Sequence, residues 1–196
     1  MFSLSRKAEN VLPTTLHGLN INADFRTVLR CLKVVEDTET TEQDKEYLIC
    51  KWFFCGVRVP YAQSLFSQFI TEDKGEQEQT ADKPIFDFDF DSVAIYSSFY
   101  QQYRIDLLTV AFLHWRAFMA LFSGLGEDTA FRRLISLRTL DTSKLEGNAL
   151  AEALKAKQAV ALPWKHNEKE VELYNDLERR LSTGEDISDL IKQLGG

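Results

Sequence analysis

The stretch Ser92–Leu125 reads SVAIYSSFYQQYRIDLLTVAFLHWRAFMALFSGL and is the most hydrophobic part of this 196-residue chain. Wound as a helix, it would carry large apolar and aromatic side chains around almost its whole circumference. That pattern is typical of helices buried at the centre of a fold rather than of surface helices. A break is expected at 103–106, where Asp106 is a candidate N-cap for a second helix that continues to about Ser123. The stretch therefore predicts two central, aromatic-rich helices.

The seven residues before this stretch, Ile85–Asp91, read IFDFDFD. In an extended segment alternate side chains point to opposite sides, so the three phenylalanines are expected to face the core, and Asp87 and Asp89 to face water. Asp91 directly precedes the first central helix and is its expected N-cap. A calcium-binding loop is the alternative, but it requires a glycine and a glutamate at fixed positions where this sequence has serines. We therefore interpret the segment as a lead-in to the helix.

Apolar residues at helical spacing predict further helices on both sides, and residues 10–21 have strand and turn character. Asn22 or Asp24 is expected to cap the first of these helices, and Thr41 the second. The predicted ranges are 24–35, 41–55, 60–69, 127–137 and 143–162. The expected fold class is all-α, a compact helical bundle with aromatic-rich central helices and a short N-terminal β-hairpin.

Two charged segments suggest the domain organisation. Residues 72–84 contain no large apolar side chain and are expected to form an acidic, mobile loop within a helical domain that spans 1–163. Residues 164–196 are expected to form a charged helical extension, because two apolar stripes run through them. Such short helices are marginal alone, so they are expected to mediate subunit contacts or to cover a groove. The candidates for self-association are Val171, Tyr174, Leu177, Leu181, Ile187, Leu190, Ile191 and Leu194.

Composition and charge describe an ordinary globular protein and argue against several kinds of partner. The chain is 44% hydrophobic and 27% charged, and residues 72–91 carry −6 of its net charge of −7. Phosphate backbones require the opposite charge, so nucleic acid is not an expected partner. No apolar run is long enough for a membrane span, and the N-terminus lacks the apolar region of a secretion signal. The three cysteines fit neither a disulfide framework nor a zinc pattern, and we expect them to be reduced in a cytosolic protein.

No motif indicates catalysis, a cofactor or a metal, so the protein is not expected to be an enzyme. The sequence G-L-G at 124–126 lacks the context of a phosphate-binding loop, and no nucleophile motif is present. His114 is expected in the middle of a helix, where a histidine usually belongs to a core or an interface. The aromatic stretch either forms a core or leaves a groove that binds a client helix. The residues concerned are Phe99, Tyr103, His114, Trp115, Phe118 and Phe122.

Two segments, FDFDFDSVAIYSSFYQQYRIDL at 86–107 and HWRAFMALFSGLGEDTAFRRLISLR at 114–138, resemble a known protein family. These are small proteins from the tail-morphogenesis region of siphophages and prophages of Gram-positive bacteria. The opening Asp24-Phe25-Arg26 is also similar, and the resemblance extends over about residues 20–162. The residues that carry it are Asp91, Tyr103, Ile105, Asp106, Leu107, His114, Trp115, Phe118, Leu121, Leu125, Phe131, Arg138 and Asp141.

The resemblance implies a tail-assembly chaperone. Such a protein binds the long tape-measure protein and keeps it soluble while the tail tube polymerises around it. The resemblance further implies a self-associating protein with no cofactor, with the major tail protein as a further partner. It also implies a location in the cytoplasm of the bacterial host and absence from the mature virion.

Two other functions remain open at this point. The first is a structural tail protein or another protein that stays associated with the virion. The second, less favoured, is a metal-dependent enzyme that uses Asp87, Asp89 and Asp91 as ligands.

Overall fold

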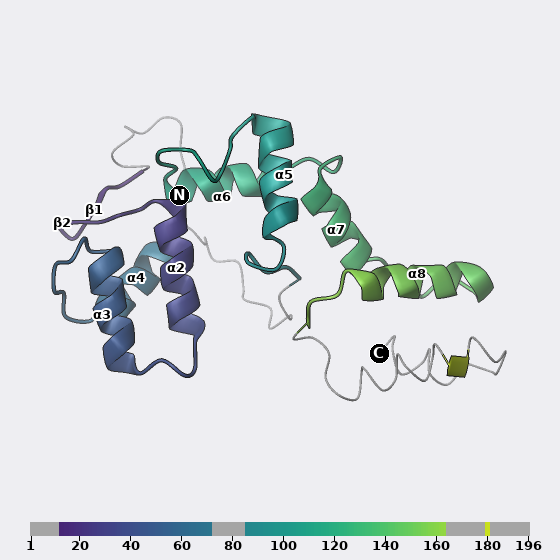
Figure 1. The fold of residues 1–196 in the computed structure, drawn as a ribbon, viewed down its shortest axis with the longest axis horizontal. Helices are drawn as coiled ribbons and strands as arrows, with labels where there is room; N and C mark the ends of the chain where they lie inside the picture. Colours follow the sequence, from purple (N-terminus) through teal and green to yellow (C-terminus); the bar gives the residue numbers. More distant parts are fainter. Residues whose placement is uncertain (1–11, 72–84, 164–178, 181–196) are drawn as a thin grey trace. The chain divides into compact units, whose positions relative to one another are not determined.

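The computed structural model describes residues 12–71, 85–163 and 179–180 (Figure 1). These residues form seven named helices and one antiparallel hairpin, which confirms the all-α fold class and the short N-terminal hairpin. None of the described helices is long and apolar enough to cross a membrane. The elements are β1 (Thr15–Leu16), β2 (Leu19–Asn20), α2 (Phe25–Glu36), α3 (Glu42–Trp52), α4 (Ala62–Thr71), α5 (Ser92–Tyr103), α6 (Trp115–Ser123), α7 (Ala130–Arg138) and α8 (Gly147–Ala159).

The described residues form two compact units. Residues 12–71 and 103–125 make the first unit, and residues 85–102 and 126–163 belong to the second. The expected acidic loop at 72–84 lies outside the described residues. So does the expected extension at 164–196, with its eight candidate self-association residues, apart from residues 179–180. The predicted domain boundary at residue 163 stays a prediction.

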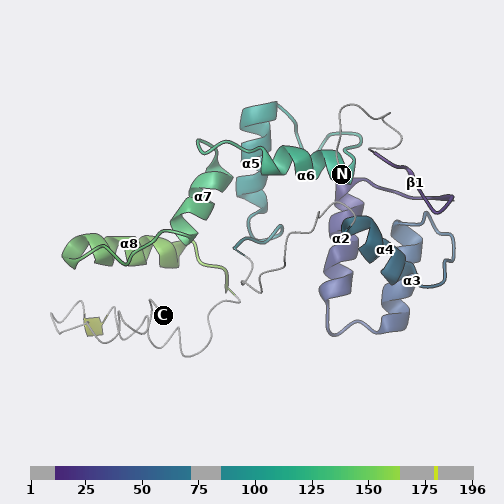
Figure 2. The same cartoon turned by 180° about the vertical axis from the view of Figure 1, so that it is seen from behind.

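The first unit is built around four phenylalanines at the end of α3 and on α4. Helix α3 packs against both α2 and α4 (Figures 1 and 2). The ring of Phe53 lies 5.0 Å from that of Phe54, 5.1 Å from that of Phe66 and 5.1 Å from that of Phe69, measured between centroids. All four side chains are fully buried. Edge and tilted ring contacts at these separations stabilise a core beyond area burial alone.

Two of the expected helix starts are confirmed. Asp24 precedes α2, and its carboxylate accepts the N–H of Arg26 at 3.1 Å. Thr41 precedes α3, and its hydroxyl oxygen accepts the N–H of Asp44 at 3.2 Å. Both caps are local in sequence, so the residue type and its position were sufficient to find them.

The third helix, α4, begins at Ala62 rather than at Pro60. Tyr61 has a left-handed backbone with φ of 58°, which cannot belong to a right-handed helix. The carboxylate of Glu46, on α3, accepts the N–H of Ala62 at 2.6 Å and that of Gln63 at 3.4 Å. A side chain from a neighbouring helix thus satisfies the first donors of α4 and sets where it starts.

The second central helix, α6, begins at Trp115 and not after Asp106. Asp106 instead closes a turn: its carbonyl accepts the N–H of Val110 at 2.9 Å, and its carboxylate accepts two further backbone N–H groups. His114 then pairs with Asp24 in an isolated antiparallel bridge, so the backbone there is extended. The expected helix over 106–114 is wrong because this long-range pairing overrides the local helical pattern.

The lead-in Ile85–Asp91 is a turn and not an extended segment. The carboxylate of Asp87 accepts two downstream backbone N–H groups, at 2.9 and 2.7 Å. This turn leaves Phe90 51% exposed, whereas Phe86 and Phe88 are half-buried. The expected alternation is wrong because an aspartate that binds nearby N–H groups competes with extended backbone.

In the second unit, α5 and the start of α7 are joined through a buried serine. The hydroxyl oxygen of Ser98 accepts the N–H of Phe131 at 2.9 Å, and the hydroxyl donates to the carbonyl of Ala94 at 2.6 Å. Helix α7 begins at Ala130 rather than at residue 127, and its N-cap is Thr129, which is fully buried. The buried hydroxyl of Thr129 accepts a backbone N–H at the start of α7 and places no charge in the core.

Candidate functional site

The six residues that the sequence marks as client-binding or core lie in the cores of the two units. Five are buried: Phe99, His114, Trp115, Phe118 and Phe122. The sixth, Tyr103, is half-buried, and its hydroxyl donates to the carbonyl of Leu121 at 2.8 Å. In the first unit the ring of Phe118 stacks on that of Phe25, with 4.7 Å between centroids. Side chains buried in this way contribute to packing and are not accessible to a client in this state.

Asp24 and His114 form a joint between the starts of α2 and α6 in the first unit. His114 caps α6, because its Nδ1 accepts the N–H of Arg116 at 3.1 Å. Its Nε2 lies 3.0 Å from the carbonyl oxygen of Pro13, so Nε2 carries the proton and donates it. The expectation that His114 lies in the middle of a helix is therefore wrong. His114 is the last extended residue, paired with Asp24, and α6 begins at the next residue.

Several donors surround the buried carboxylate of Asp24. The Arg26 side chain binds it at 2.8 and 2.9 Å, and the N–H of Leu113 donates to it at 3.1 Å. Burial alone raises the pKa of Asp24. The hydrogen bonds from the Arg26 side chain and from the N–H groups of Leu113 and Arg26 outweigh burial, so the pKa is held below its ordinary value of 3.8.

Asp24→Asn is expected to lower the free energy of unfolding at neutral pH. It is also expected to make that free energy change less with pH in the acid range. Because the folded-state pKa lies below 3.8, the stabilisation from Asp24 is fully present above that value and is lost as pH falls through the folded pKa. Urea unfolding of both proteins between about pH 2 and pH 7, followed by tryptophan fluorescence, measures this effect. The difference in stability should shrink toward acid pH. A difference that stays constant would contradict a role for the charge.

Asp91 and Arg138 form a buried ion pair in the second unit. The two guanidinium nitrogens Nη1 and Nη2 donate to Oδ2 and Oδ1 at 2.6 and 2.7 Å, and the side chains are 7% and 1% exposed for Arg138 and Asp91. Asp91 stands at the start of α5, where its carbonyl accepts the N–H of Ile95 at 3.0 Å. Its carboxylate, however, accepts from Arg138 and from the N–H of Asp87.

Arg138 also binds two carbonyl groups from distant parts of the second unit. Nη1 donates to the carbonyl of Ile85 at 3.0 Å, and Nε donates to the carbonyl of Val160. The guanidinium lies 5.9 Å from the ring centroid of Phe90. One side chain thus joins the lead-in, the end of α7 and the residue after α8. No local pattern indicated this role, and the only signal was the resemblance, which includes both Asp91 and Arg138.

The three alternate aspartates of the lead-in have different surroundings. Asp87 closes the turn and Asp91 binds Arg138, whereas Asp89 is exposed. Among the residues that the structure describes, no group of three or more His, Cys, Asp or Glu side chains is placed to hold a metal ion.

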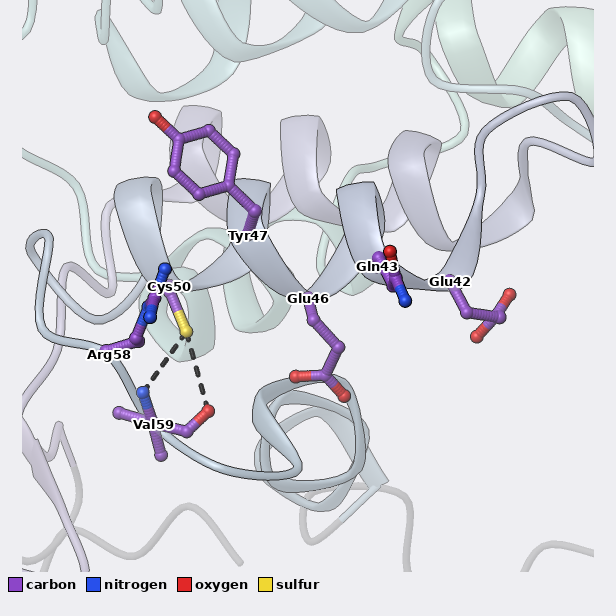
Figure 3. Close-up of a pocket in the computed structure, with 7 residues that line it drawn as sticks. All are labelled: Glu42, Gln43, Glu46, Tyr47, Cys50, Arg58 and Val59. Atoms are coloured by element: carbon purple, nitrogen blue, oxygen red, sulfur yellow. Dashed lines mark hydrogen bonds between the residues drawn. The ribbon is translucent and has the colours of Figure 1, made fainter.

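The first unit has an open pocket beside α3 that the sequence did not indicate. Its volume is about 370 Å³. Figure 3 shows residues of α3 along one side and the following loop on the other. The lining residues are Glu42, Gln43, Glu46, Tyr47, Cys50, Arg58 and Val59. We call this the α3 pocket.

The walls and floor of the α3 pocket differ in character. The floor is formed by Cys50 and Val59, which are both buried. The N–H of Val59 donates to Sγ of Cys50 at 3.3 Å, and that thiol lies 3.5 Å from the carbonyl of Val59 (Figure 3). Tyr47 is 59% exposed. The pocket therefore combines an apolar floor with an accessible aromatic ring, a combination found at binding surfaces.

Comparison with protein families gives a match over most of the chain. The family model described as "Bacteriophage Gp15 protein" matches residues 11–162. Searches of curated proteins and of solved structures found no match. The matched range contains the Asp24–His114 joint, the Asp91–Arg138 pair and the α3 pocket. The chain therefore belongs to the bacteriophage Gp15 protein family.

Proposed function

We propose that this phage protein is a tail-assembly chaperone that binds the tape-measure protein and keeps it soluble while the tail forms. The observation that carries the proposal is the family match over residues 11–162. That range includes the 20–162 region whose motifs resemble tail-assembly proteins. Membership of a bacteriophage family supports the phage context, and the motifs supply the more specific role.

The surface of the protein is compatible with this role. A long helical client with apolar faces needs a partner that offers apolar contacts and remains soluble through its charge. The chain has a net charge of −7, and both of its described units expose large apolar side chains. In the first unit these are Tyr47, Val57, Tyr61, Leu108 and Phe112, and in the second Ile85, Phe90, Val93, Tyr100, Leu137 and Leu140.

The proposal includes the expected partners and location. The protein acts in the cytoplasm of the bacterial host as a homo-oligomer, without enzymatic activity, and is absent from the mature virion. The tape-measure protein is its main client, and the major tail protein is a further partner.

Co-expression with the tape-measure protein encoded by the same phage tests the proposal. The fraction of tape-measure protein in the soluble lysate is expected to rise several-fold, because apolar helix faces are covered before they aggregate. Two controls are expression of the tape-measure protein alone and co-expression of an unrelated acidic helical protein. Equal solubility in all three experiments would contradict the chaperone function.

A second experiment distinguishes the chaperone from a structural tail protein. Mass spectrometry of purified virions is expected to detect the tape-measure protein without this chain. Stoichiometric amounts of this chain in the particles would instead indicate a structural tail protein.

A further inference from the structure

We propose that the C-terminal segment 164–196 folds back within its own chain and covers one face of α8. The segment would use its first apolar stripe, which consists of Val171, Tyr174, Leu177 and Leu181. The covered face contains Leu150 and Leu154, which lie one helical turn apart, and we call it the leucine face. The proposal does not depend on the proposed function.

The leucine face is buried in a part of α8 that lies beyond its contact with α7. Leu150 and Leu154 are only 6% and 7% exposed. Among the helices that the structure describes, α8 packs mainly against α7, and Nζ of Lys157 donates to the carbonyl of Leu140 at 2.8 Å. Leu150 precedes Lys157 by about 10 Å along the helix axis, and α8 extends past α7 (Figures 1 and 2). Another part of the chain therefore covers this face.

Two described residues of the C-terminal segment indicate which part this is. Residues 179 and 180 are helical and belong to the second unit. Arg179 is exposed, whereas Arg180 is half-buried and its Nε is shielded from solvent. The segment thus has one side that faces water and another side that packs within the second unit.

The difference between the two arginines fits a helix that docks through Leu177 and Leu181. Successive residues of a helix are about 100° apart, so Arg179 would point about 180° away from the midpoint of these two leucines. Arg180 would lie only about 80° from that midpoint, at the edge of the docked face. An edge residue is expected to be half-buried and an opposite residue exposed, as both are here.

The length of the connection favours the same chain over a second copy. Helix α8 ends at Ala159 and the stripe begins at Val171, so residues 160–170 are available to reverse the chain. The stripe from Val171 to Leu181 would span about 15 Å as a helix, close to the length of α8. A segment on so short a tether has a local concentration of about millimolar, far above that of a second copy in dilute solution.

The charges of the two parts are complementary. Residues 130–163 contain six Lys and Arg residues against three acids, and one of the six, Arg138, is paired with Asp91. Residues 164–196 contain eight acids against five Lys and Arg residues. Opposite net charges favour the approach of the segment to α7 and α8.

Photo-crosslinking from the two arginines of the full chain tests the proposal. The crosslinking amino acid p-benzoylphenylalanine replaces Arg180 in one variant and Arg179 in a matched control. From position 180 the crosslink is expected to fall within Gly147–Ala159, with a yield several-fold higher than from position 179. The purified chain is used alone, so a crosslink to α8 in the absence of the tape-measure protein excludes that protein as the occupant.

Isotope labelling distinguishes the same chain from a second copy. Light and isotopically heavy forms of the Arg180 variant are combined in urea, refolded together and irradiated. Crosslinked peptides that are both light or both heavy are expected, because the segment docks on its own α8. Mixed light and heavy pairs would show that the segment of one copy covers α8 of another.

Hydrogen exchange of the α8 amides tests whether the stripe itself provides the cover. Leu177→Ala/Leu181→Ala is expected to speed this exchange by about tenfold or more, because truncating packed leucines lowers local stability. Val93→Ala and Arg179→Ala are the controls, since Val93 is an exposed apolar residue of the same unit and Arg179 is exposed in the same segment. Both should leave α8 exchange within about twofold of the wild type. Circular dichroism melts establish that these variants are folded.

Each outcome supports or overturns the proposal. Crosslinks within one chain from position 180 to α8, together with faster exchange in Leu177→Ala/Leu181→Ala, support it. Crosslinks outside α8, equal yields from positions 179 and 180, or mixed isotope pairs would each overturn it. Unchanged α8 exchange in Leu177→Ala/Leu181→Ala would also overturn it, because the leucine face would then be covered by something other than the stripe.

Discussion

Asp91→Ala is expected to lower the free energy of unfolding of the second unit by about 3–5 kcal/mol, the cost typical of removing one partner of a buried ion pair. The variant leaves the guanidinium of Arg138 buried without its two bonds of 2.6 and 2.7 Å. The N–H of Asp87 also loses its acceptor. As a helix cap alone, Asp91 would contribute only about 1 kcal/mol.

Hydrogen exchange of the amides in α5 and α7 measures this loss locally, because the two units need not unfold together. Asp89→Ala is the matched control, since Asp89 is an exposed aspartate of the same lead-in, and its effect should stay within about 0.5 kcal/mol. The double variant Asp91→Leu/Arg138→Met should recover most of the loss, because neither charge remains buried. If Asp91→Ala and Asp89→Ala have equal effects, the ion pair does not stabilise the unit.

Phe53→Ala is expected to lower the free energy of unfolding of the first unit by about 3–5 kcal/mol, the range for removing a buried aromatic ring. Phe53 is fully buried and contacts the rings of Phe54, Phe66 and Phe69. Its backbone carbonyl also accepts the N–H of Asn22 at 2.7 Å, so the residue is held on both sides and the cavity has little freedom to collapse.

Trp52 and Trp115 both lie in the first unit, so their fluorescence during urea unfolding reports on it. A Trp164→Phe background removes the third tryptophan. Phe53→Leu should cost less than Phe53→Ala, because leucine fills part of the cavity. Tyr47→Ala, on the exposed face of α3 itself, should change stability by no more than about 0.5 kcal/mol. A Phe53→Ala effect as small as that of Tyr47→Ala would contradict the central role of this cluster.

The sequence was sufficient to find two helix caps that neighbouring residues form, although it missed the local turn that Asp87 closes. Asp24 and Thr41 cap their helices through N–H groups two and three residues away. Apolar periodicity located most helices, because a buried helical face requires that spacing.

Prediction failed where distant segments meet. The helical pattern between Asp106 and His114 is overridden by the bridge to Asp24, which lies far away in the sequence. The carboxylate of Asp91 is bound by Arg138, and Glu46 caps a helix other than its own. The α3 pocket also depends on how a loop folds back on a helix. Local spacing carries no information about such contacts.

The bonds of Arg138 have a mechanical consequence. Ile85 and Val160 lie next to the parts of the chain at 72–84 and 164–196, and Arg138 binds the carbonyls of both. A pull on the chain before Ile85 or after Val160 would therefore load the hydrogen bonds to one guanidinium group. From there it passes to Asp91 and the start of α5. One guanidinium group thus ties together the two places where the described part of the second unit begins and ends.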